Sequence, residues 1–418
     1  MADDSHGQEY SRRSFVKTTG VSAAVGATAL SGCLGGIAGS GGGTRTIGAA
    51  IPQTGELSEF GAHYERQSEF ALSFVNEDSE RVAMSYEDTQ TSPNVGVTAA
   101  QKLVNQDGLP MLFAGLSSGV ALAIARSVAI PNGTLMATGG TSSKISTLDD
   151  DDLVFRGSPP TQFQARALAT LVSNEGVSST AVVFINNDFG GAISEEFKSA
   201  YEQIGGTVTD MVGYESGKSS YRSQLNAATA GDPDGIVFIA YPKAFTVMAK
   251  QAFEMGIKED VQYFANEAVK GADVSDNVDA QAINGMKGTQ PSPPTNRDIY
   301  QEFIAANQEE YGREPIVWEA YYFDTTVLCA LAAVAVDSYE SGALKEAVYP
   351  LSRPEGTSYN YKQIGDAIGA LENGEPINYD GVSGSVDLDD RGDVPGSYRQ
   401  WEVVDGSFEL GSFIDSQV

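Results

Sequence analysis

The chain has 418 residues, of which 41% are hydrophobic and 20% charged, and its formal net charge at pH 7 is −30. So large an excess of acids argues against nucleic acid and anionic lipid as partners. The hydrophobic content and its clear periodicity exclude a disordered chain. About 385 residues follow Cys33, which is more than one typical domain and predicts two.

The first 33 residues have the pattern of an export signal. Arg12 and Arg13 stand in SRRSFVK, and the short apolar run VSAAVGATAL follows, too short to span roughly 30 Å of hydrocarbon. The paired arginines resemble the twin-arginine export signal, and LSGC, ending at Cys33, resembles the lipobox of exported lipoproteins. We therefore predict a lipid on Cys33, a glycine-rich tether over 34–46, and anchoring to the outer face of the cytoplasmic membrane. The alternative is an ordinary signal peptide with an incidental cysteine.

The acidic residues are spread along the whole chain and form no single tail. Their repulsion is tolerable where salt is concentrated, because the screening length falls to about 3 Å at 1 M. Composition and export signal together are typical of a lipoprotein from a halophilic archaeon. The second cysteine, Cys329, lies in the apolar run TTVLCALAAVAV. We predict that it is a small core residue, and we expect no disulfide framework.

Strand and helix patterns alternate along the chain after the tether. The first run predicts strands at 46–52, 81–88, 110–115, 134–138 and 153–160, and helices at 58–77, 92–108 and 117–130. The second run predicts strands at 181–187, 207–214, 235–241 and 261–266, and helices at 189–205, 221–231 and 242–256. This alternation indicates parallel sheets built from βαβ units. Because the two runs are separated near 158–164, we expect two α/β lobes. Three helical stretches later in the chain are expected to cover a sheet.

Two polar corners follow neighbouring strands of the first run. Ser117, Ser118 and Gly119 come after one strand, and Thr138 to Thr141 follows the next. Ligands of open α/β sheets bind beyond the carboxyl ends of the strands, and helix N-termini attract negative groups. Together the corners could therefore hold one small anion. The alternative is that Ser117 or Ser118 only caps the helix. No dinucleotide or Walker motif is present.

Seven stretches resemble, in order, periplasmic binding proteins of the branched-chain amino acid (Leu/Ile/Val-binding) type, the solute receptors of ABC importers. They are IPQTGELSEFGAHYERQSEFA, EDTQTSPNVGVTAAQKLV, GLSSGVALAIA, MATGGTSSKIST, VVFINNDFGG, DGIVFIAYPKAFTVMAKQAFEMGI and YFANEAVKG. The resemblance implies a periplasmic binding protein type I fold, with two doubly wound, Rossmann-like lobes joined by a hinge of several crossings. We expect lobe 1 to contain 47–159 and 290–388, and lobe 2 to contain 160–289 and 389–418. The glycine-rich DDRGDVPGS (389–397) is expected to be one crossing.

The resemblance also implies how a ligand is held. It assigns the α-carboxylate to Ser118 and Thr141 and the α-ammonium to Glu267. It implies further ligand contacts from Gly139, whose carbonyl faces the ammonium, from Gly140, and from Tyr241, which covers the ligand. From the residues alone, Glu267 follows an apolar strand with no Lys or Arg within two positions, so it suits a cationic group. The alternative is a solvated loop acid.

The chain departs from the family pattern at two aromatic positions. Phe189 and Phe60 stand where the family often has tyrosine, which makes the expected side-chain pocket less polar and favours an aliphatic ligand. Trp318 and Tyr321 lie on a predicted helix and either wall the cleft or belong to the core.

An enzyme is not expected. The chain has two histidines, and His6 lies in the segment predicted to be removed, so neither a histidine-rich metal site nor a Ser-His-acid set is available. We expect no metal and no cofactor. The predicted function is an extracytoplasmic receptor that delivers an amino acid to the permease and ATPase subunits of an ABC importer. Two alternatives stay open: a ligand that is an amide, a urea-like solute or an aromatic acid, or a role in presenting the ligand to a chemotaxis transducer.

Overall fold

The computed structural model describes residues 43–353 and 355–414. Arg12, Arg13 and Cys33, on which the predicted export and lipidation depend, lie outside the described residues. Within the described part, no helix combines the length and the apolar character needed to cross a membrane.

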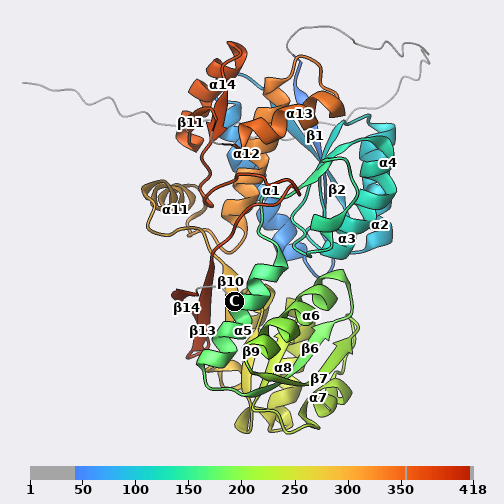
Figure 1. Ribbon diagram of the computed structural model, residues 1–418, viewed down its shortest axis with the longest axis vertical. Helices are drawn as coiled ribbons and strands as arrows, with labels where there is room; N and C mark the ends of the chain where they lie inside the picture. Colours follow the sequence, from blue (N-terminus) through green and yellow to red (C-terminus); the bar gives the residue numbers. More distant parts are fainter. Residues whose placement is uncertain (1–42, 354, 415–418) are drawn as a thin grey trace, which may run out of the picture. The chain divides into compact units, whose positions relative to one another are not determined.

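The first lobe contains a five-stranded parallel sheet of order β2-β1-β3-β4-β5 (Figure 1). Its strands are β1 (Arg45–Ile51), β2 (Val82–Asp88), β3 (Met111–Ala114), β4 (Leu135–Ala137) and β5 (Val154–Phe155). Successive side chains enter different hydrophobic clusters, because side chains alternate across a strand. Phe113 and Ala49 belong to one cluster, whereas Leu112 and Ala50 belong to the other. Both faces of this sheet are therefore buried, as is usual for parallel sheets.

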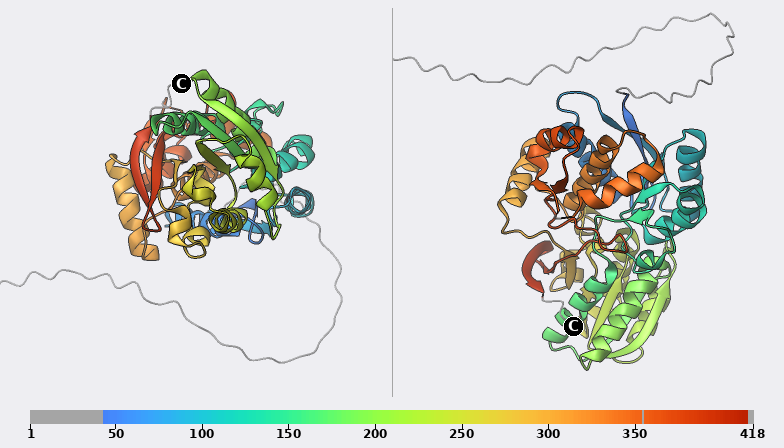
Figure 2. Two further views of the ribbon diagram at one scale, coloured as in Figure 1. Left: turned by 90° about the horizontal axis from the view of Figure 1, so that it is seen from below. Right: turned by 45° about the horizontal axis from the view of Figure 1, so that its top comes forward.

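Helices from two parts of the sequence cover the first sheet (Figures 1 and 2). The early helices are α1 (Ser58–Val75), α2 (Pro93–Gln101), α3 (Ser118–Ile124) and α4 (Ile130–Asn132), with π-helical segments at Lys102–Gln106 and Ala125–Ala129. The late elements are α11 (Asp298–Tyr311), α12 (Glu319–Ala335), α13 (Ser341–Leu351) and α14 (Ile364–Glu372), with the small sheet of β11 (Thr357–Tyr359) and β12 (Ile377–Tyr379). Because α12 packs on α1 and contacts β1 and β2, the late helices complete the first lobe.

The second lobe contains a seven-stranded sheet of order β14-β13-β10-β9-β8-β6-β7. Its strands are β6 (Ser179–Ile185), β7 (Thr207–Tyr214), β8 (Gly235–Ile239), β9 (Gln262–Ala265), β10 (Lys287–Pro291), β13 (Tyr398–Val404) and β14 (Ser407–Ile414). The pairs β10–β13 and β13–β14 are antiparallel and the others parallel. Its helices are α5 (Thr161–Asn174), α6 (Asp188–Gln203), α7 (Arg222–Thr229), α8 (Pro242–Glu254), α9 (Ala272–Ser275) and α10 (Ala280–Ile283).

The second lobe contains elements that were not expected from the sequence, namely α5, β10 and the short helices α9 and α10. The helix α5 occupies 161–174, a stretch to which no helix was assigned, and it packs against α6. The strand β10 pairs with β9 and β13, so it belongs to the second sheet although it straddles the predicted boundary between 289 and 290.

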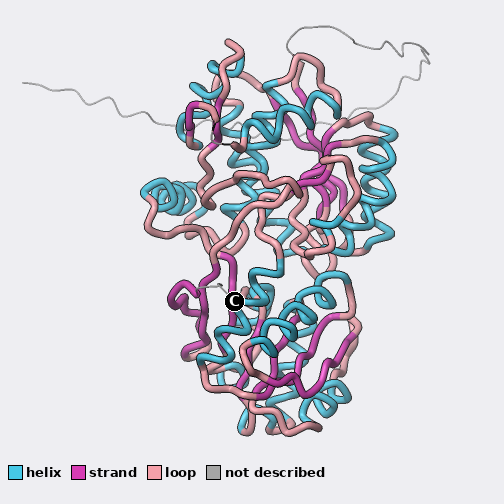
Figure 3. Tube along the Cα trace, viewed as in Figure 1, coloured by secondary structure: helices cyan, strands magenta, loops and turns pink. Residues whose placement is uncertain are grey.

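Three segments connect the lobes, at 156–160, 292–297 and 380–397, and they run largely as loops (Figure 3). Hydrogen bonds join them: Arg156 N donates to Gly392 O at 2.9 Å, and Ser292 N donates to Ser397 O at 2.9 Å. The hydroxyl of Tyr398 donates to Pro160 O at 3.2 Å. Two doubly wound α/β lobes joined by several crossings are the predicted architecture.

Candidate functional site

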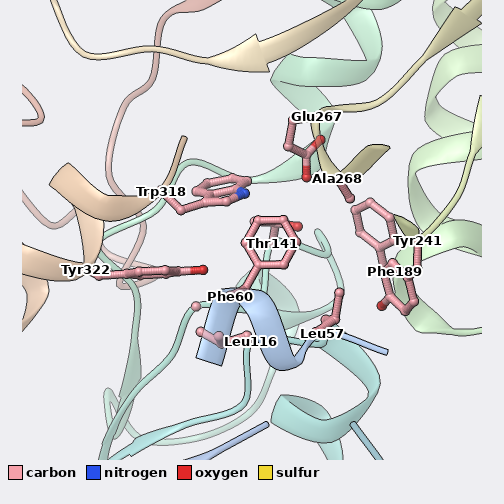
Figure 4. A pocket seen from close by; sticks show the side chains of 11 residues that line it. Leu57, Phe60, Leu116, Thr141, Phe189, Tyr241, Glu267, Ala268, Trp318 and Tyr322 are labelled. Carbon is pink, nitrogen blue, oxygen red and sulfur yellow. The ribbon is translucent and has the colours of Figure 1, made fainter. Parts of the chain in front are cut away.

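A cavity lies between the two lobes and receives side chains from both (Figure 4). The first lobe and the loop before α12 contribute Leu57, Phe60, Leu116, Gly139, Thr141, Trp318 and Tyr322. The second lobe contributes Phe189, Tyr241, Glu267 and Ala268. Six of the eight predicted ligand-binding residues therefore line one cavity. Ser118 and Gly140 do not line it.

The first polar corner turns sharply between β3 and α3. Gly115 has φ +70°, and a Cβ there would lie 2.7 Å from the backbone N of Ala121, so glycine is required. The oxygen of Ser118 accepts hydrogen bonds from the backbone N–H groups of Thr141 at 3.2 Å and Ser142 at 3.0 Å. The Ser118 hydroxyl therefore fastens the second corner to the first.

Ser117 occupies the N-cap position of α3, but its hydroxyl does not cap the helix as the alternative interpretation expected. Its side chain makes no capping hydrogen bond to α3, and its hydroxyl lies 3.3 Å from the hydroxyl of Tyr241 in the other lobe. The adjacent serines thus point in different directions, Ser118 along the corner and Ser117 across the cleft.

The second polar corner is held by hydroxyl groups and close packing. Thr138 Oγ1 donates to Ala114 O at 2.6 Å and accepts from Gly140 N at 3.1 Å. A Cβ on Gly140 would lie 2.9 Å from the side-chain end of Ile145 and 3.0 Å from the Cβ of Ala121, so a larger residue would force these neighbours to shift. Thr141 follows, largely buried, and lines the cavity with its side chain. The corner therefore offers a hydroxyl beside an ordered backbone turn.

A buried arginine ties this corner to the hinge. The guanidinium of Arg156 donates to Ser142 O at 2.9 Å and Gly140 O at 3.2 Å, and its Nε donates to Asp393 Oδ1 at 2.7 Å. Asp393 lies in the third crossing segment. Sequence reasoning missed Arg156, because its side-chain partners are 10 to 237 residues away.

Glu267 begins a 3₁₀ turn directly after β9, and only 3% of the residue is exposed. Burial raises the pKa of this carboxyl group to about 7, although hydrogen bonds from Gln164 and Asn266 act in the opposite direction. The side-chain amide of Gln164 donates to Glu267 Oε2 and also to Thr289 O at 3.2 Å. Among the described residues, no basic side chain forms an ion pair with Glu267. A buried carboxylate is costly unless it is protonated or meets a cation, so this position suits a ligand ammonium group.

Aromatic rings form most of the remaining wall. The rings of Phe189 and Tyr241 are stacked in the second lobe, with centroids 5.8 Å apart and planes inclined by 16°. Figure 4 shows Phe60 and Trp318 on the other side, with Glu267 directed toward the space between the lobes. The wall is therefore apolar except at Glu267, Thr141 and a few aromatic edges.

Sequence reasoning found part of this wall. Trp318 and Tyr321 were expected either to form the cleft wall or to belong to the core. Trp318 lines the cavity, but it is Tyr322 and not Tyr321 that lines it beside Trp318. Tyr322 is four residues after Trp318, one helical turn on, which is the spacing that could have identified it. Leu57, Leu116 and Ala268 were also missed, and each is adjacent or close in sequence to a residue that had been singled out.

Polar contacts join the lobes at the rim of the cleft. Lys144 Nζ lies 2.7 Å from Asp188 Oδ1 at the start of α6, and Lys243 Nζ donates to Gly55 O at 2.7 Å. Each pair has one member in each lobe. The lobes therefore contact each other at the rim of the cleft in the described conformation.

Comparisons with known proteins agree with this architecture. A chemotactic signal transduction system substrate-binding protein, BasB, of Halobacterium salinarum is 23% identical over an alignment of 395 residues that covers 89% of this chain and 90% of BasB. A leucine-binding protein, LivK, of Thermotoga maritima has a TM-score of 0.76 at 21% identity, covering 89% of this chain and 99% of that one. A solute-binding protein of an R. palustris ABC transporter, solved in complex with benzoate, has a TM-score of 0.73 at 15% identity, covering 89% of this chain and 96% of that one.

These structural likenesses confirm the predicted type I fold of two α/β lobes. The family model described as periplasmic binding protein matches residues 44–354. That match spans well over half of the sequence, and the chain therefore belongs to the periplasmic binding protein family.

Proposed function

We propose that this protein is an extracytoplasmic receptor for a small zwitterionic amino acid with a branched aliphatic side chain. The observation that carries the proposal is Glu267, a buried carboxylate without a cationic partner among the described residues, in the same cavity as the hydroxyl of Thr141. Thr141, on the corner that the Ser118 hydroxyl fastens, holds the ligand carboxylate, and the carbonyl of Gly139 faces the ammonium. Glu267 binds the ammonium.

Binding proceeds by closure of the lobes. The carboxylate end of the ligand engages the first lobe, and Glu267 and Tyr241 belong to the second, so both ends are held only in the closed conformation. The differential affinity of the ligand for that conformation shifts the population toward it. Lys144 and Asp188 add an ion pair at the rim when the lobes meet.

The apolar wall selects the ligand side chain. Phe60 and Phe189 bring no hydroxyl group into the cavity, so an aliphatic side chain leaves no buried polar group unpaired there. Discrimination among leucine, isoleucine and valine is expected to be modest, since one methylene group contributes only about 1–3 kcal/mol in such a pocket.

The receptor is proposed to reach the outer face of the cytoplasmic membrane by the twin-arginine route and to be anchored through a lipid on Cys33. From there it delivers its ligand to the permease and ATPase subunits of an ABC importer. The distributed negative charge suits a halophilic archaeon, where salt screens the repulsion.

A second role is favoured by a specific comparison. BasB is named for a chemotactic signal transduction system, and its match extends over 89% of this chain. A receptor with the same cleft could present the bound amino acid to a membrane chemotaxis transducer. Deletion of the gene separates the two roles, because loss of uptake identifies the importer and loss of attraction alone identifies the transducer.

Calorimetric titration at high salt tests the proposed ligand class. Leucine, isoleucine and valine are expected to bind, whereas benzoate and acetamide, which lack an ammonium group, are expected to bind weakly or not at all. Binding of an uncharged amide or of benzoate in preference to every amino acid would favour the alternative ligand classes.

A further inference from the structure

Trp318, one wall of the cleft, has an unusual backbone conformation. Its φ of 78° and ψ of −26° lie in the left-handed region, which bulky residues seldom adopt. Trp318 is nevertheless largely buried and lines the cavity. Such a conformation persists only when neighbouring contacts impose it, and it is often found at ligand sites.

The next residue, Glu319, makes several contacts that hold the adjoining loop. Its side chain is fully buried, and its Oε2 accepts from the backbone N–H of Ile316 at 2.9 Å, which folds the loop back just before Trp318. Arg313 donates from both terminal nitrogens, to Oε1 at 2.6 Å and to Oε2 at 2.9 Å. Burial alone would raise the pKa of Glu319, but the hydrogen bonds from Arg313 and His63 lower it to about 2.

The helix α1 joins the same cluster. His63 Nδ1 lies 3.0 Å from Glu319 Oε1, and Arg66 Nη1 lies 3.4 Å from the same oxygen. One turn before His63 stands Phe60, which also lines the cavity, and the rings of Phe60 and His63 meet edge to face with centroids 6.5 Å apart. The cluster thus connects the element that carries Phe60 to the loop that carries Trp318.

None of the four residues of this cluster lines the cavity. The first turn of α12 links Trp318 to a third lining residue. The backbone N–H of Tyr322 donates to Trp318 O at 2.9 Å, and Tyr322 also lines the cavity. The cluster therefore lies behind three walls and outside the space that a ligand fills.

We infer that Glu319, Arg313, Arg66 and His63 are positioning residues that fix Trp318 and Phe60 relative to each other and so set the width of the ligand side-chain pocket. Selectivity for side-chain size is then controlled from outside the cavity. The selectivity part of this inference rests on the proposed amino acid ligand, whereas the placement of Trp318 does not.

Fluorescence can follow Trp318 directly, because the chain has only two tryptophans. In a Trp401→Phe background Trp318 is the sole emitter. Glu319→Gln keeps the size of the side chain but weakens its bonds to Arg313 and His63. We expect the ligand-free variant to emit at longer wavelength and to be quenched more readily by acrylamide, with an unchanged far-UV circular dichroism spectrum.

Asp324→Asn is the matched control. Asp324 is another fully buried acid on α12, but its partners are Tyr379, Val382 and Ser383, away from the cluster. This variant is expected to leave the Trp318 emission as in the parent. Any shift of equal size would mean that loss of a buried charge in α12 disturbs the wall generally, and would overturn the specific role of Glu319.

Selectivity supplies the second measurement. The ratio of the leucine to the alanine dissociation constants is expected to change by about tenfold in Glu319→Gln, the lower end of what a methylene-sized difference gives in an apolar pocket. Arg313→Lys removes one of the two nitrogen donors that hold Glu319, on a partly exposed side chain. It should change the ratio of dissociation constants in the same direction but by less, and it replaces Glu319→Gln if that variant does not fold. A folded variant with parent-like Trp318 emission would overturn the inference. If the parent binds no amino acid, the emission still decides the placement of Trp318, and only the proposed ligand fails.

Discussion

Replacing Glu267 with glutamine removes one charge from the cleft at almost constant shape. The glutamine oxygen can still accept the hydrogen bond that Gln164 donates to the carboxylate, so the local packing is retained. What disappears is the ability to ionise. Because the carboxyl group is buried, the substitution should weaken ligand binding and at the same time stabilise the folded protein.

The gain in stability follows from the pKa. Burial raises it from 4.5 to about 7, a difference of roughly 2.5 units, and each unit corresponds to about 1.4 kcal/mol. The folded protein holds this proton more tightly than the unfolded chain does. The stabilising contribution is therefore complete below pH 4.5 and is lost as the pH rises through 7. Glu267→Gln should be more stable than the parent by up to about 3 kcal/mol at pH 8, and much closer to it at pH 5.

The loss in binding comes from the unpaired ammonium group. Removing one member of a buried charged pair costs about 2–5 kcal/mol of binding, or roughly thirty-fold to several thousand-fold in affinity. In the parent, a ligand ammonium also drives ionisation of Glu267. Near pH 6 the parent should thus release close to one proton per ligand bound, and its affinity should fall by up to about tenfold per pH unit below 7.

Two assays measure these effects. Chemical denaturation of ligand-free parent and variant at pH 5 and pH 8, at constant high salt, gives the change in stability. Calorimetric titration with leucine, isoleucine and valine in buffers of different ionisation enthalpy gives affinity and proton release. If Glu267→Gln binds these amino acids as tightly as the parent, or if the two proteins show the same stability difference at both pH values, the assignment of Glu267 as the ammonium site is refuted.

The remaining predictions concern the corner, the export signal and the closure. Ser118→Ala should weaken binding by calorimetry more than Ser117→Ala, because Ser118 holds the Thr141 and Ser142 N–H groups whereas Ser117 only faces Tyr241; the reverse order would contradict this. Changing Arg12 and Arg13 together to lysine should leave precursor in the cytoplasm by cell fractionation, and normal export would exclude the twin-arginine route. Cys33→Ala should abolish lipid labelling and release the protein from the membrane fraction; a variant that stays membrane-bound has another anchor. X-ray scattering should show a smaller radius of gyration with saturating ligand, and an unchanged radius would argue against lobe closure.

Local patterns in the sequence determined most of the fold. Alternating apolar strands and amphipathic helices predicted β1 to β9 and the helices between them except α5, because the periodicity of apolar residues is a property of short stretches of sequence. The helix α5 was missed although Ala165, Leu168, Ala169 and Val172 have the spacing of a buried helical face. The strand β10 could not be recognised, since its sequence KGTQP has no periodicity and acquires strand structure from its partners β9 and β13.

The sequence by itself also placed Thr141, Glu267 and Tyr241 at strand ends, where ligands of α/β proteins bind. It could not decide which of two adjacent serines faces the other lobe, because the turn at Gly115 and the approach of Tyr241 set that direction. The buried bonds of Arg156 and the cluster around Glu319 were equally invisible to it. Their partners are brought together only when the crossings close and α12 packs on α1, so long-range packing, and no local pattern, determines them.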